Sequence, residues 1–268
     1  MGGGEADGQG IGERMSQSLD RALTLLSGLA REPKTLDQLA EEIGVHKSTV
    51  LRLLRTLETH HFVRREGQRY YRLGSALFDL AQQALEDRDV RRTAQSALAG
   101  LNARTGHTVH LASYEDGEVV YIDKFEGRHS VRMYSRIGKR APLHCTAVGK
   151  VLVAAMTPEK RADVVSRIDF FTRTPNTITT PSAYETELDL VADRGYAVDN
   201  AEHEDFIHCV AAPVRGPGGV VLAAVSVSVP KVLLDYDGLM ALVPELLAAA
   251  EEASVHSGWT GNRKGKLE

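Results

Sequence analysis

The 268-residue chain lacks several features that would assign it to whole classes of protein. No stretch approaches the roughly 20 consecutive apolar residues that cross a membrane as a helix. Only two cysteines are present, too few for a disulfide framework, as expected in a reducing compartment. The start of the chain is rich in glycine and has no apolar run, so we expect residues 1–17 to be a disordered tail. These absences predict a cytoplasmic protein with no membrane partner.

The segment from Thr35 to Leu57 shows two short helical patterns separated by Gly44, where a left-handed residue would end the first helix. Thr35 is followed three residues later by Gln38, the spacing of a reciprocal capping box at a helix start. Apolar residues recur at helical spacing in both halves, so each helix buries one face. Two such helices joined by a tight turn predict a helix-turn-helix, whose second helix enters the major groove of DNA.

The second of these helices has polar and basic residues at its start and on its outward side, away from the apolar stripe. Residues of these types at these positions reach base edges and phosphates from a recognition helix. The DNA contacts predicted on this helix are His46, Lys47, Ser48, Thr49 and Arg52.

A basic hairpin follows, turned at Gly67, as in the wing of a winged helix-turn-helix. We expect Arg69 and Arg72 to contact DNA from this wing. Residues 43–72 contain seven Lys or Arg against two Glu, a net charge of +5, whereas the whole chain has a net charge of -4. Helical hairpins with exposed cations also occur in proteins that never bind nucleic acid. The basic wing in an acidic chain favours the DNA-binding interpretation.

We assign residues 18–73 to this winged helix-turn-helix domain. An apolar helical stripe at residues 19–29 completes its core. Residues 74–89 continue as a linker helix with an apolar stripe of its own. A second copy of the helix is the simplest cover for that stripe, so we expect a homodimer that reads paired half-sites. Burial of the stripe within a single chain is the alternative.

After Gly106 the pattern changes to strands alternating with helices, which predicts an α+β fold class and a sensor-like domain at residues 90–253. Residues 254–268 have the composition of a frayed tail. The strands expected here are 108–114, 118–125, 131–134, 140–143, 196–199, 209–214 and 220–229, and the helices are 146–155, one from 158, 182–194 and 233–253.

Several motifs resemble those of the IclR family of bacterial transcriptional regulators, over nearly the whole chain from about residue 21 to residue 253. The matching runs are Lys47–Val50 and Arg52–Leu54 in the helix-turn-helix, Tyr71–Gly74 in the wing, Pro142–Lys150, Arg194–Glu202 and Cys209–Val214. Residues 131–140 further resemble the branch of the family that regulates 2-keto-3-deoxygluconate and related sugar-acid catabolism.

The resemblance implies a C-terminal effector-binding domain of GAF-like fold that takes small carboxylates or aromatic acids, in chains that form homodimers and often dimers of dimers. The effector pocket would lie between the loop after Leu143 and the sheet. Carried over position by position, the effector-binding residues would be Ala147, Val148, Gly149, Asp199, Cys209, Ser226 and Ser228.

The residues themselves are consistent with an anion site in this region. Thr146 precedes a predicted helix whose free N–H groups can bind a carboxylate, although its hydroxyl can equally serve only as a helix cap. Asp199 would repel a carboxylate but can accept hydrogen bonds from the hydroxyl groups of a sugar acid. Arg132 and Arg136 are further anion candidates, against the alternative that both are simply solvated.

Two other classes of function have weaker signals. Cys145 beside His144 at a helix start could be an activated nucleophile, but neighbours on a strand point to opposite faces and no orienting partner is evident. A metal- or redox-responsive regulator would use both thiols, but their spacing matches no tetrahedral zinc signature. The residues of that alternative are Cys145, Glu202, His203, His208 and Cys209.

The sequence therefore predicts a DNA-binding transcriptional regulator without catalytic activity, metal or cofactor, whose binding to a double-stranded operator is controlled by a small organic acid. Repression is the favoured direction, although that depends on where the operator lies, which the chain does not encode. The identity of the acid, the operator sequence and the choice between dimer and tetramer stay open.

Overall fold

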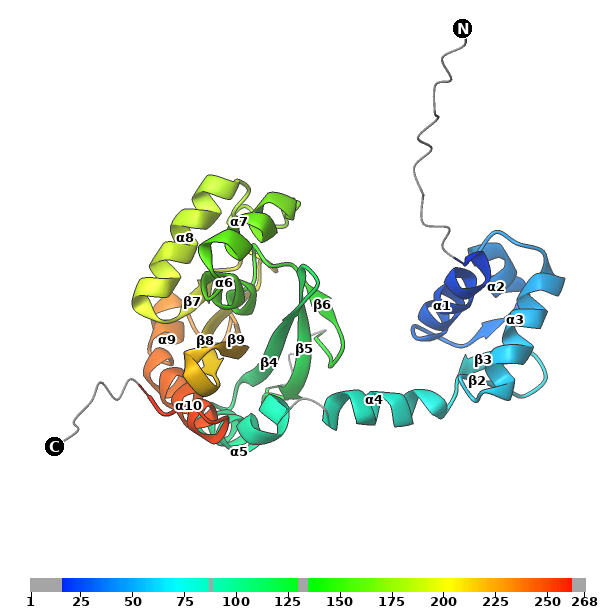
Figure 1. Cartoon of the computed structure of the whole chain (residues 1–268), viewed down its shortest axis with the longest axis horizontal. Helices are drawn as coiled ribbons and strands as arrows, with labels where there is room; N and C mark the ends of the chain where they lie inside the picture. Colours follow the sequence, from blue (N-terminus) through cyan, green and yellow to red (C-terminus); the bar gives the residue numbers. More distant parts are fainter. Residues whose placement is uncertain (1–15, 87–88, 130–134, 262–268) are drawn as a thin grey trace, which may run out of the picture. The chain divides into compact units, whose positions relative to one another are not determined.

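The computed structural model describes residues 16–86, 89–129 and 135–261 and divides into two compact units, residues 1–84 and 85–268 (Figure 1). The N-terminal unit combines helices with a small sheet. Its elements are α1 (Gln17–Leu29), β1 (Lys34–Thr35), α2 (Leu36–Glu42), α3 (Lys47–Thr59), β2 (Val63–Glu66), β3 (Tyr70–Leu73) and most of α4 (Ala76–Glu86).

The helix-turn-helix forms as predicted. Thr35 caps α2 and Gln38 returns the hydrogen bond, so both halves of the capping box are present. Gly44 follows α2 with a φ of 64°, a left-handed conformation that glycine adopts without the clash a Cβ would cause. The buried faces of the helices meet in a core that includes Leu25 and Leu54. This core fixes α3 with its opposite side exposed.

The wing is a three-stranded antiparallel sheet in the order β1-β3-β2, rather than the hairpin alone that the sequence predicts. The additional strand is short: Lys34 pairs with Tyr71 and Thr35 with Tyr70. Two residues carry too little alternation to be predicted as a strand from the sequence. Their pairing ties the wing to the start of α2, because Thr35 is both a strand residue and the cap of that helix.

The linker helix α4 exposes apolar side chains. Phe78 is 74% exposed and Leu80, a member of the predicted stripe, is 50% exposed. Isolated exposed apolar residues are common, but a helix that presents several of them in one short segment is typical of a contact surface.

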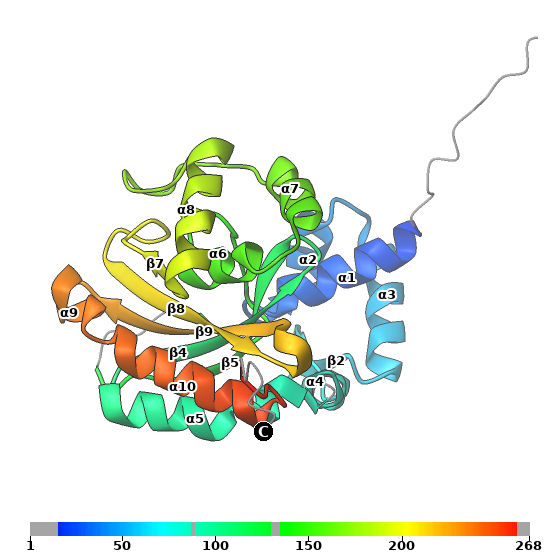
Figure 2. The same cartoon turned by 60° about the vertical axis from the view of Figure 1, so that its left-hand side comes forward.

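The C-terminal unit is a six-stranded antiparallel sheet, in the order β6-β5-β4-β9-β8-β7, with helices on both faces (Figure 2). Its strands are β4 (Thr108–Glu115), β5 (Glu118–Phe125), β6 (Arg140–Ala141), β7 (Ala197–Asp199), β8 (Ile207–Arg215) and β9 (Val221–Pro230). Its helices are α5 (Asp89–Thr105), α6 (Ala147–Ala154), α7 (Pro158–Arg167), α8 (Pro181–Arg194), α9 (Tyr236–Met240) and α10 (Val243–His256), with a 3-10 turn at Pro217–Gly219.

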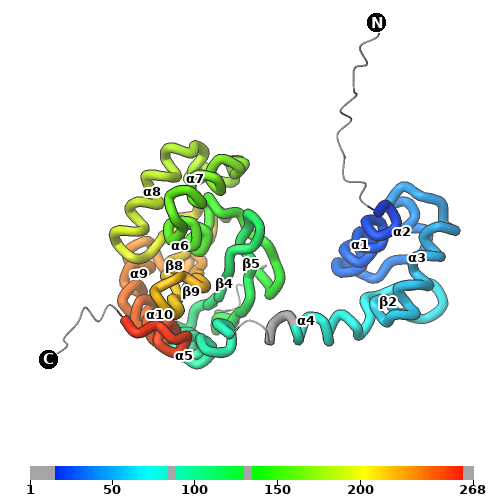
Figure 3. The backbone as a smooth tube through the Cα atoms, in the orientation of Figure 1, coloured from blue at the N-terminus to red at the C-terminus, as the bar shows by residue number. Residues whose placement is uncertain are grey.

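Two apolar cores hold the layers together. On one face α5 and α10 lie side by side and bury residues such as Leu98 and Leu246 against β4, β8 and β9. On the other face α6 and α8 bury residues such as Val151 and Leu188. Figure 3 traces the backbone of the chain, in which α6 follows β5 and the edge strand β6 in sequence. This connection places the start of α6 against the sheet, where the candidate site forms.

The prediction of a single closing helix at residues 233–253 is wrong in two respects. The segment forms two helices, α9 and α10, because Pro244 lies in the first turn of α10, where its missing N–H is tolerated, and could not continue a helix from α9. The second helix also passes the predicted end of the domain. Ser254, placed in the tail by sequence, is buried, donates to the carbonyl of Ala250 at 2.6 Å and accepts the Arg215 N–H at 2.8 Å.

Other differences are smaller. The strand predicted at 140–143 ends at Ala141, and residues 143–145 form a turn. The strand predicted at 131–134, together with Arg132, lies outside the described residues. Within the part of the chain that the structure describes, no helix is both long and apolar enough to span a membrane.

Candidate functional site

The N-terminal residues of α3 are arranged to start the helix as well as to face outward. His46 is the N-cap, and its Nδ1 accepts the backbone N–H of Ser48 at 3.3 Å and lies 2.9 Å from the Ser48 hydroxyl. Lys47 is exposed and its Nζ lies 2.8 Å from Oδ1 of Asp37 on α2. An exposed ion pair of this kind is weak, so the ammonium can exchange the carboxylate for a DNA phosphate.

The cations of α3 and the wing fall into two groups. Three of them form ion pairs: Lys47 with Asp37, Arg65 with Glu58, and Arg72, a predicted DNA contact, with Glu66. Arg65 also lies over the ring of Tyr71. The others form no ion pair with any described residue and are exposed, which leaves their charge available to an anionic partner. These are Arg52, Arg55, Arg64 and Arg69. Of these, Arg55 and Arg64 were not predicted as contacts, although Arg55 lies one helical turn after Arg52.

The C-terminal unit contains a cavity between the start of α6 and the sheet, with an empty volume of about 590 Å³ that includes its opening to solvent. Its lining is mixed polar and apolar. The lining residues are His110, Tyr121, Ser135, Lys139, Ala141, Thr146, Ala147, Val148, Asp199, His203, Glu204, Ile207, Cys209, Ser226 and Ser228.

Six of the seven residues predicted to bind the effector line this cavity, and Gly149 does not. Gly149 instead allows close packing behind the cavity: a Cβ at this position would lie 2.4 Å from the carbonyl oxygen of Leu143. Its N–H donates to the Thr146 hydroxyl at 3.2 Å. Gly149 therefore packs closely against the Leu143 backbone, and its contact with an effector stays a prediction.

The first turn of α6 presents backbone donors to the cavity. Thr146 is the N-cap: its hydroxyl accepts from Gly149 and donates to the carbonyl of Pro142 at 2.8 Å. The N–H groups of Ala147 and Val148, by contrast, have no protein acceptor among the described residues, and both residues line the cavity. Both alternatives raised for Thr146 are thus compatible, because the cap leaves two donors for an anion.

A chain of hydrogen bonds crosses the floor of the cavity. His110 on β4 lies 2.7 Å through Nε2 from the Ser135 hydroxyl and 3.3 Å through Nδ1 from the Ser228 hydroxyl. The Cys209 thiol donates to the same Ser228 oxygen at 3.1 Å. Burial, with a smaller contribution from Lys124, lowers the pKa of His110 to about 3, so the imidazole is neutral. The floor is therefore polar but carries no charge at His110.

His110 was not predicted, although strand register could have indicated it. His110 pairs with Ser226 across β4 and β9, and Cys209 pairs with Ser228 across β8 and β9. Directly paired residues of an antiparallel sheet share a face, so alternate residues of the predicted strands belong to one surface. The contributions of Ser135 and Lys139 come from the segment before β6, for which the sequence has no comparable signal.

Asp199 is the acidic group at the end of β7. Its Oδ1 accepts the N–H of Glu202 at 2.7 Å and the N–H of His203 at 3.4 Å. Burial nevertheless raises the pKa of Asp199 to about 7, so the carboxyl changes protonation near neutral pH. When protonated it can donate a hydrogen bond to a ligand, and when ionised it can only accept one.

The thiol and imidazole candidates for catalysis are placed differently from the prediction. Cys145 and His144 lie in a turn, not a strand, and His144 Nε2 lies 3.1 Å from the carbonyl oxygen of Phe171. The imidazole nearest to the Cys145 sulfur is that of His203, at 3.6 Å. Burial raises the pKa of Cys145 to about 12, so the thiol stays protonated and is a poor nucleophile. Within the described ranges, no three His, Cys, Asp or Glu residues are grouped to hold a metal ion.

Together, an exposed basic recognition helix with a wing and a separate unit with a cavity of mixed polar and apolar lining define a DNA-binding transcriptional regulator. Comparison with known proteins agrees. Residues 18–67 match the IclR helix-turn-helix domain, and residues 82–255 match the family described as bacterial transcriptional regulator IclR C-terminal. The chain belongs to the IclR family, and its homologues are regulators, not enzymes.

Similar proteins span almost the whole chain. The transcriptional regulator KdgR of Dickeya chrysanthemi is 36% identical over 244 residues, which cover 90% of this chain and 80% of KdgR. The crystal structure of IclR from Thermotoga maritima superposes with a TM-score of 0.78 at 33% identity, covering 90% of this chain and 99% of that chain. A homologue from Microbacterium hydrocarbonoxydans, solved in complex with 4-hydroxybenzoate, has the same fold, with a TM-score of 0.77 at 24% identity over 90% of this chain and 98% of that chain.

Proposed function

We propose that this regulator binds a small hydroxylated organic acid in the cavity of its C-terminal unit, and that binding changes its affinity for an operator. One observation carries the proposal: the two N–H groups of Ala147 and Val148 and a hydrogen-bonding floor line the same cavity. A carboxylate is suited to the N–H groups at the start of α6. The hydroxyl groups of the same molecule are suited to Ser226, Ser228 and Asp199.

Within this class, 2-keto-3-deoxygluconate is the effector that we propose first. It carries a carboxylate at one end and hydroxyl groups along the rest of its chain, which correspond to the two kinds of group in the cavity. The motif at residues 131–140 and the similarity to KdgR support this choice. An aromatic acid is the second candidate, because the ring of Tyr121 lines the cavity beside His110, with ring centroids 4.9 Å apart.

On DNA, we propose that α3 reads the major groove through His46, Lys47, Ser48, Thr49 and Arg52, and that Arg69 and Arg72 act from the wing. The exposure of α3 and the uncompensated arginines support this assignment. Repression is the simpler direction of regulation, because a bound protein that blocks a promoter needs no contact with polymerase. A DNA-binding regulator must be in the same compartment as the chromosome, and we therefore propose that this protein is cytoplasmic.

The exposed apolar residues of α4 support a homodimer in which a second copy covers this helix, with a dimer of dimers as the larger assembly. A two-fold dimer would present two recognition helices to paired half-sites. An effector that favours one arrangement of the dimer would change the spacing of those helices, and operator binding would change with it.

A thermal-shift screen of the purified full-length protein tests the effector proposal. The panel holds 2-keto-3-deoxygluconate, other sugar acids, pyruvate, glyoxylate, 4-hydroxybenzoate and zinc. A ligand that binds only the folded protein stabilises it by about 2.7 kcal/mol at a hundred times its Kd. We expect a shift with the sugar acid that also alters retention of an operator fragment.

The other outcomes separate the alternatives. A shift with 4-hydroxybenzoate alone would replace the sugar acid with an aromatic effector. A shift with zinc alone would favour the metal-responsive alternative, which the described residues support only through the contact between Cys145 and His203. No shift with any member of the panel would contradict an organic-acid effector of these classes.

A further inference from the structure

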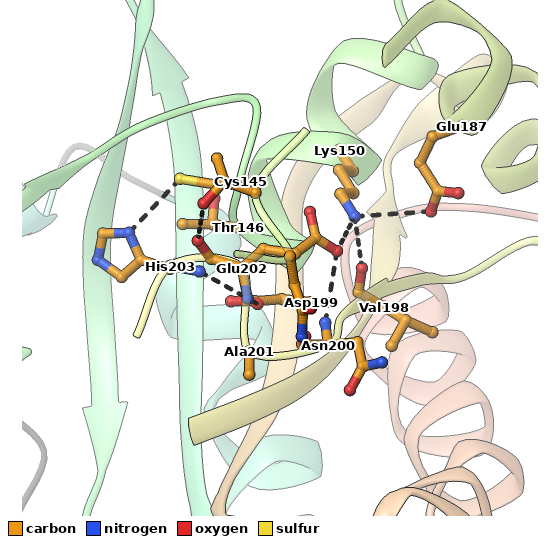
Figure 4. Close-up of polar contacts among 12 residues, drawn as sticks. Cys145, Thr146, Lys150, Glu187, Val198, Asp199, Asn200, Ala201, Glu202 and His203 are labelled. Atoms are coloured by element: carbon orange, nitrogen blue, oxygen red, sulfur yellow. Dashed lines mark hydrogen bonds and ion pairs between the residues drawn. The ribbon is translucent and has the colours of Figure 1, made fainter. Parts of the chain in front are cut away.

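Behind the cavity, α6 carries a buried cation that the proposed ligand contacts do not include. Lys150 is only 1% exposed although it bears a charge. Its Nζ lies 2.6 Å from Oε1 of Glu202, 2.7 Å from the carbonyl oxygen of Val198 and 3.7 Å from Oε1 of Glu187 (Figure 4). A buried charge is tolerated only when it is paired and hydrogen-bonded, so these contacts are what keep Lys150 in place.

All three partners of Lys150 belong to other segments of the chain. Val198 lies on β7, directly before Asp199, and Glu202 lies in the turn that follows. Glu187 lies on α8, where it also accepts a hydrogen bond from Arg194 at 2.7 Å. The ammonium of Lys150 thus joins α6 to both sides of Asp199. In Figure 4 its side chain extends from α6 toward the segment that contains Val198 and Glu202.

The turn from Asp199 to His203 needs such support. Ala201 has a φ of 57°, a left-handed conformation that residues with a Cβ rarely adopt. The backbone of the turn is held from a second side by the segment 174–177, where Thr174 donates to the carbonyl of Ala201 and Thr177 to that of Glu202, both at 2.7 Å. The same turn supplies the two N–H groups that orient the Asp199 carboxyl.

Two parts of the cavity lining, the start of α6 and Asp199, are therefore connected through one side chain. The N–H groups of Ala147 and Val148 lie in the first turn of α6, and Lys150 lies on the same short helix. Asp199 lies on β7, where the carbonyl of Val198 accepts a hydrogen bond from Lys150. A helix is stiff over such a short distance, so the position of the N–H groups relative to Asp199 depends on the contacts of Lys150.

We propose that Lys150 is a positioning residue for effector recognition: through its hydrogen bonds to Val198 and Glu202 it fixes the N–H groups of α6 relative to Asp199, and so selects the length of the organic acid that contacts both. The inference rests on the proposed function of this cavity as an effector site. It adds that selectivity for the length of the organic acid depends on a residue that does not contact the ligand.

The test compares four full-length proteins: wild type, Lys150→Met, Glu202→Gln and the control Arg167→Met. The control removes a cation from an exposed ion pair with Asp163 on α7. Glu202→Gln keeps the shape of the side chain and the N–H that Asp199 accepts, and serves in place of Lys150→Met if that variant does not fold. Calorimetry measures the affinity for 2-keto-3-deoxygluconate, a six-carbon acid with several hydroxyl groups, and for pyruvate, a three-carbon acid with none.

We expect Lys150→Met to lower the affinity for the longer acid by about tenfold, the size of one misplaced hydrogen bond, and to change the affinity for pyruvate by less than about threefold. The control should bind both acids as the wild type does. Equal losses for the two acids would indicate general loosening of the domain, and unchanged affinity for the longer acid would show that Lys150 does not position the site. Either result would overturn the proposal.

Amide hydrogen exchange followed by mass spectrometry gives a readout that needs no ligand. If Lys150 holds the turn, exchange in residues 199–203 is faster in Lys150→Met by about tenfold or more, while the strands β4 and β9 remain as protected as in the wild type. Unchanged exchange in the turn overturns the inference. The two proposals can also fail separately. If no acid of the panel binds the wild type but amide exchange in residues 199–203 is faster in Lys150→Met, the proposed function fails and the positioning of Asp199 by Lys150 stands.

Discussion

The imidazole Nδ1 of His110 lies 3.3 Å from the hydroxyl oxygen of Ser228 across the boundary between β4 and β9. The two residues come from segments 118 positions apart, and each binds a second group: His110 the hydroxyl of Ser135, and Ser228 the thiol of Cys209. Because burial keeps His110 neutral, its ring can exchange donor and acceptor by changing tautomer. The cavity floor can therefore adapt its hydrogen bonds to a ligand without a change in net charge.

Replacement of Arg52 by Ala should separate the two functions of the protein. The side chain is exposed on α3 and forms no ion pair with the described residues, so its loss should leave the fold intact. We expect operator affinity to fall by about 1–3 kcal/mol, the contribution of one good base contact, with effector affinity unchanged. Fluorescence anisotropy with an operator fragment measures the first quantity and calorimetry the second. Arg92→Ala, which removes an exposed guanidinium from α5, is the matched control.

Arg64 in the wing tests the electrostatic part of DNA binding. A cation that neutralises a phosphate releases a counterion, so affinity for DNA falls linearly with salt concentration on a double-logarithmic plot. Arg64→Ala should reduce the slope of that plot by about 1 and weaken binding to specific and random DNA alike. The opposite result, a variant with the wild-type slope, would place Arg64 away from the DNA.

Asp199→Ala should do the reverse of Arg52→Ala. Asp199 is buried against the cavity, where it can bond the hydroxyl groups of an acid. Loss of these bonds should weaken effector binding by about 1–3 kcal/mol and leave the DNA affinity of the ligand-free protein unchanged. Asp193→Ala, which removes an exposed carboxylate from α8, should bind as the wild type does. Equal loss of DNA and effector binding from Asp199→Ala would argue against separable sites.

Asp199 should also make stability depend on pH. Burial raises its pKa from 3.8 to about 7. Between these values the folded protein keeps a proton that the unfolded chain has released, so stability falls as pH rises, by up to about 1.4 kcal/mol per pH unit. Below the lower value and above the higher one, this group adds no slope.

The variant Asp199→Asn isolates this effect, because an amide does not titrate. Urea unfolding at pH 5, 6, 7 and 8 should show the variant gaining stability relative to the wild type from pH 5 to 7 and no further gain from pH 7 to 8. Asp193→Asn should track the wild type throughout. A stability difference that is the same at all four pH values would contradict a raised pKa at Asp199.

Gly149→Ala tests the packing behind the cavity. The added Cβ would lie 2.4 Å from the Leu143 carbonyl oxygen and 2.8 Å from the Thr146 hydroxyl oxygen, too close without movement of the backbone. We expect a loss of about 1–3 kcal/mol of stability, as is typical of overpacking, measured by thermal or urea unfolding. Gly100→Ala is a suitable control, because there the close atom is the flexible end of the Arg104 side chain at 3.1 Å. Equal stability of both variants would show that the backbone at Leu143 can move away from the added Cβ at little energetic cost.

The N-terminal unit was largely predictable because its signals are local. A capping box, a left-handed glycine and an apolar stripe act within a few residues of chain, and together they specify a helix, a turn and a second helix. The residues exposed on α3 follow directly from those that are buried. The short strand β1 was missed, because its two residues are held by pairing with β3 rather than by a pattern of their own.

The lining of the cavity was predictable only in part. Six of the lining residues followed from the family resemblance, while Gly149, predicted with them, is not among the lining residues and packs closely against the Leu143 backbone. Sequence motifs show that a position is constrained but not by which neighbour. The end of α10 was missed for a similar reason: Ser254 looks like a tail residue by composition, and its burial depends on a hydrogen bond with Arg215 far earlier in the chain.

The sequence by itself determined the helix-turn-helix, most of the longer strands and helices, and the excess of positive charge on the wing and recognition helix, since each depends on spacing between near neighbours. Only the tertiary structure decided which groups share the cavity. Strand pairing across the sheet brought His110 to Ser228, and the contacts of α6 brought Lys150 to Glu202. Burial then set their chemistry, because the pKa of Asp199 and the tolerance of a charged Lys150 depend on the surroundings that the fold creates and not on the residues alone.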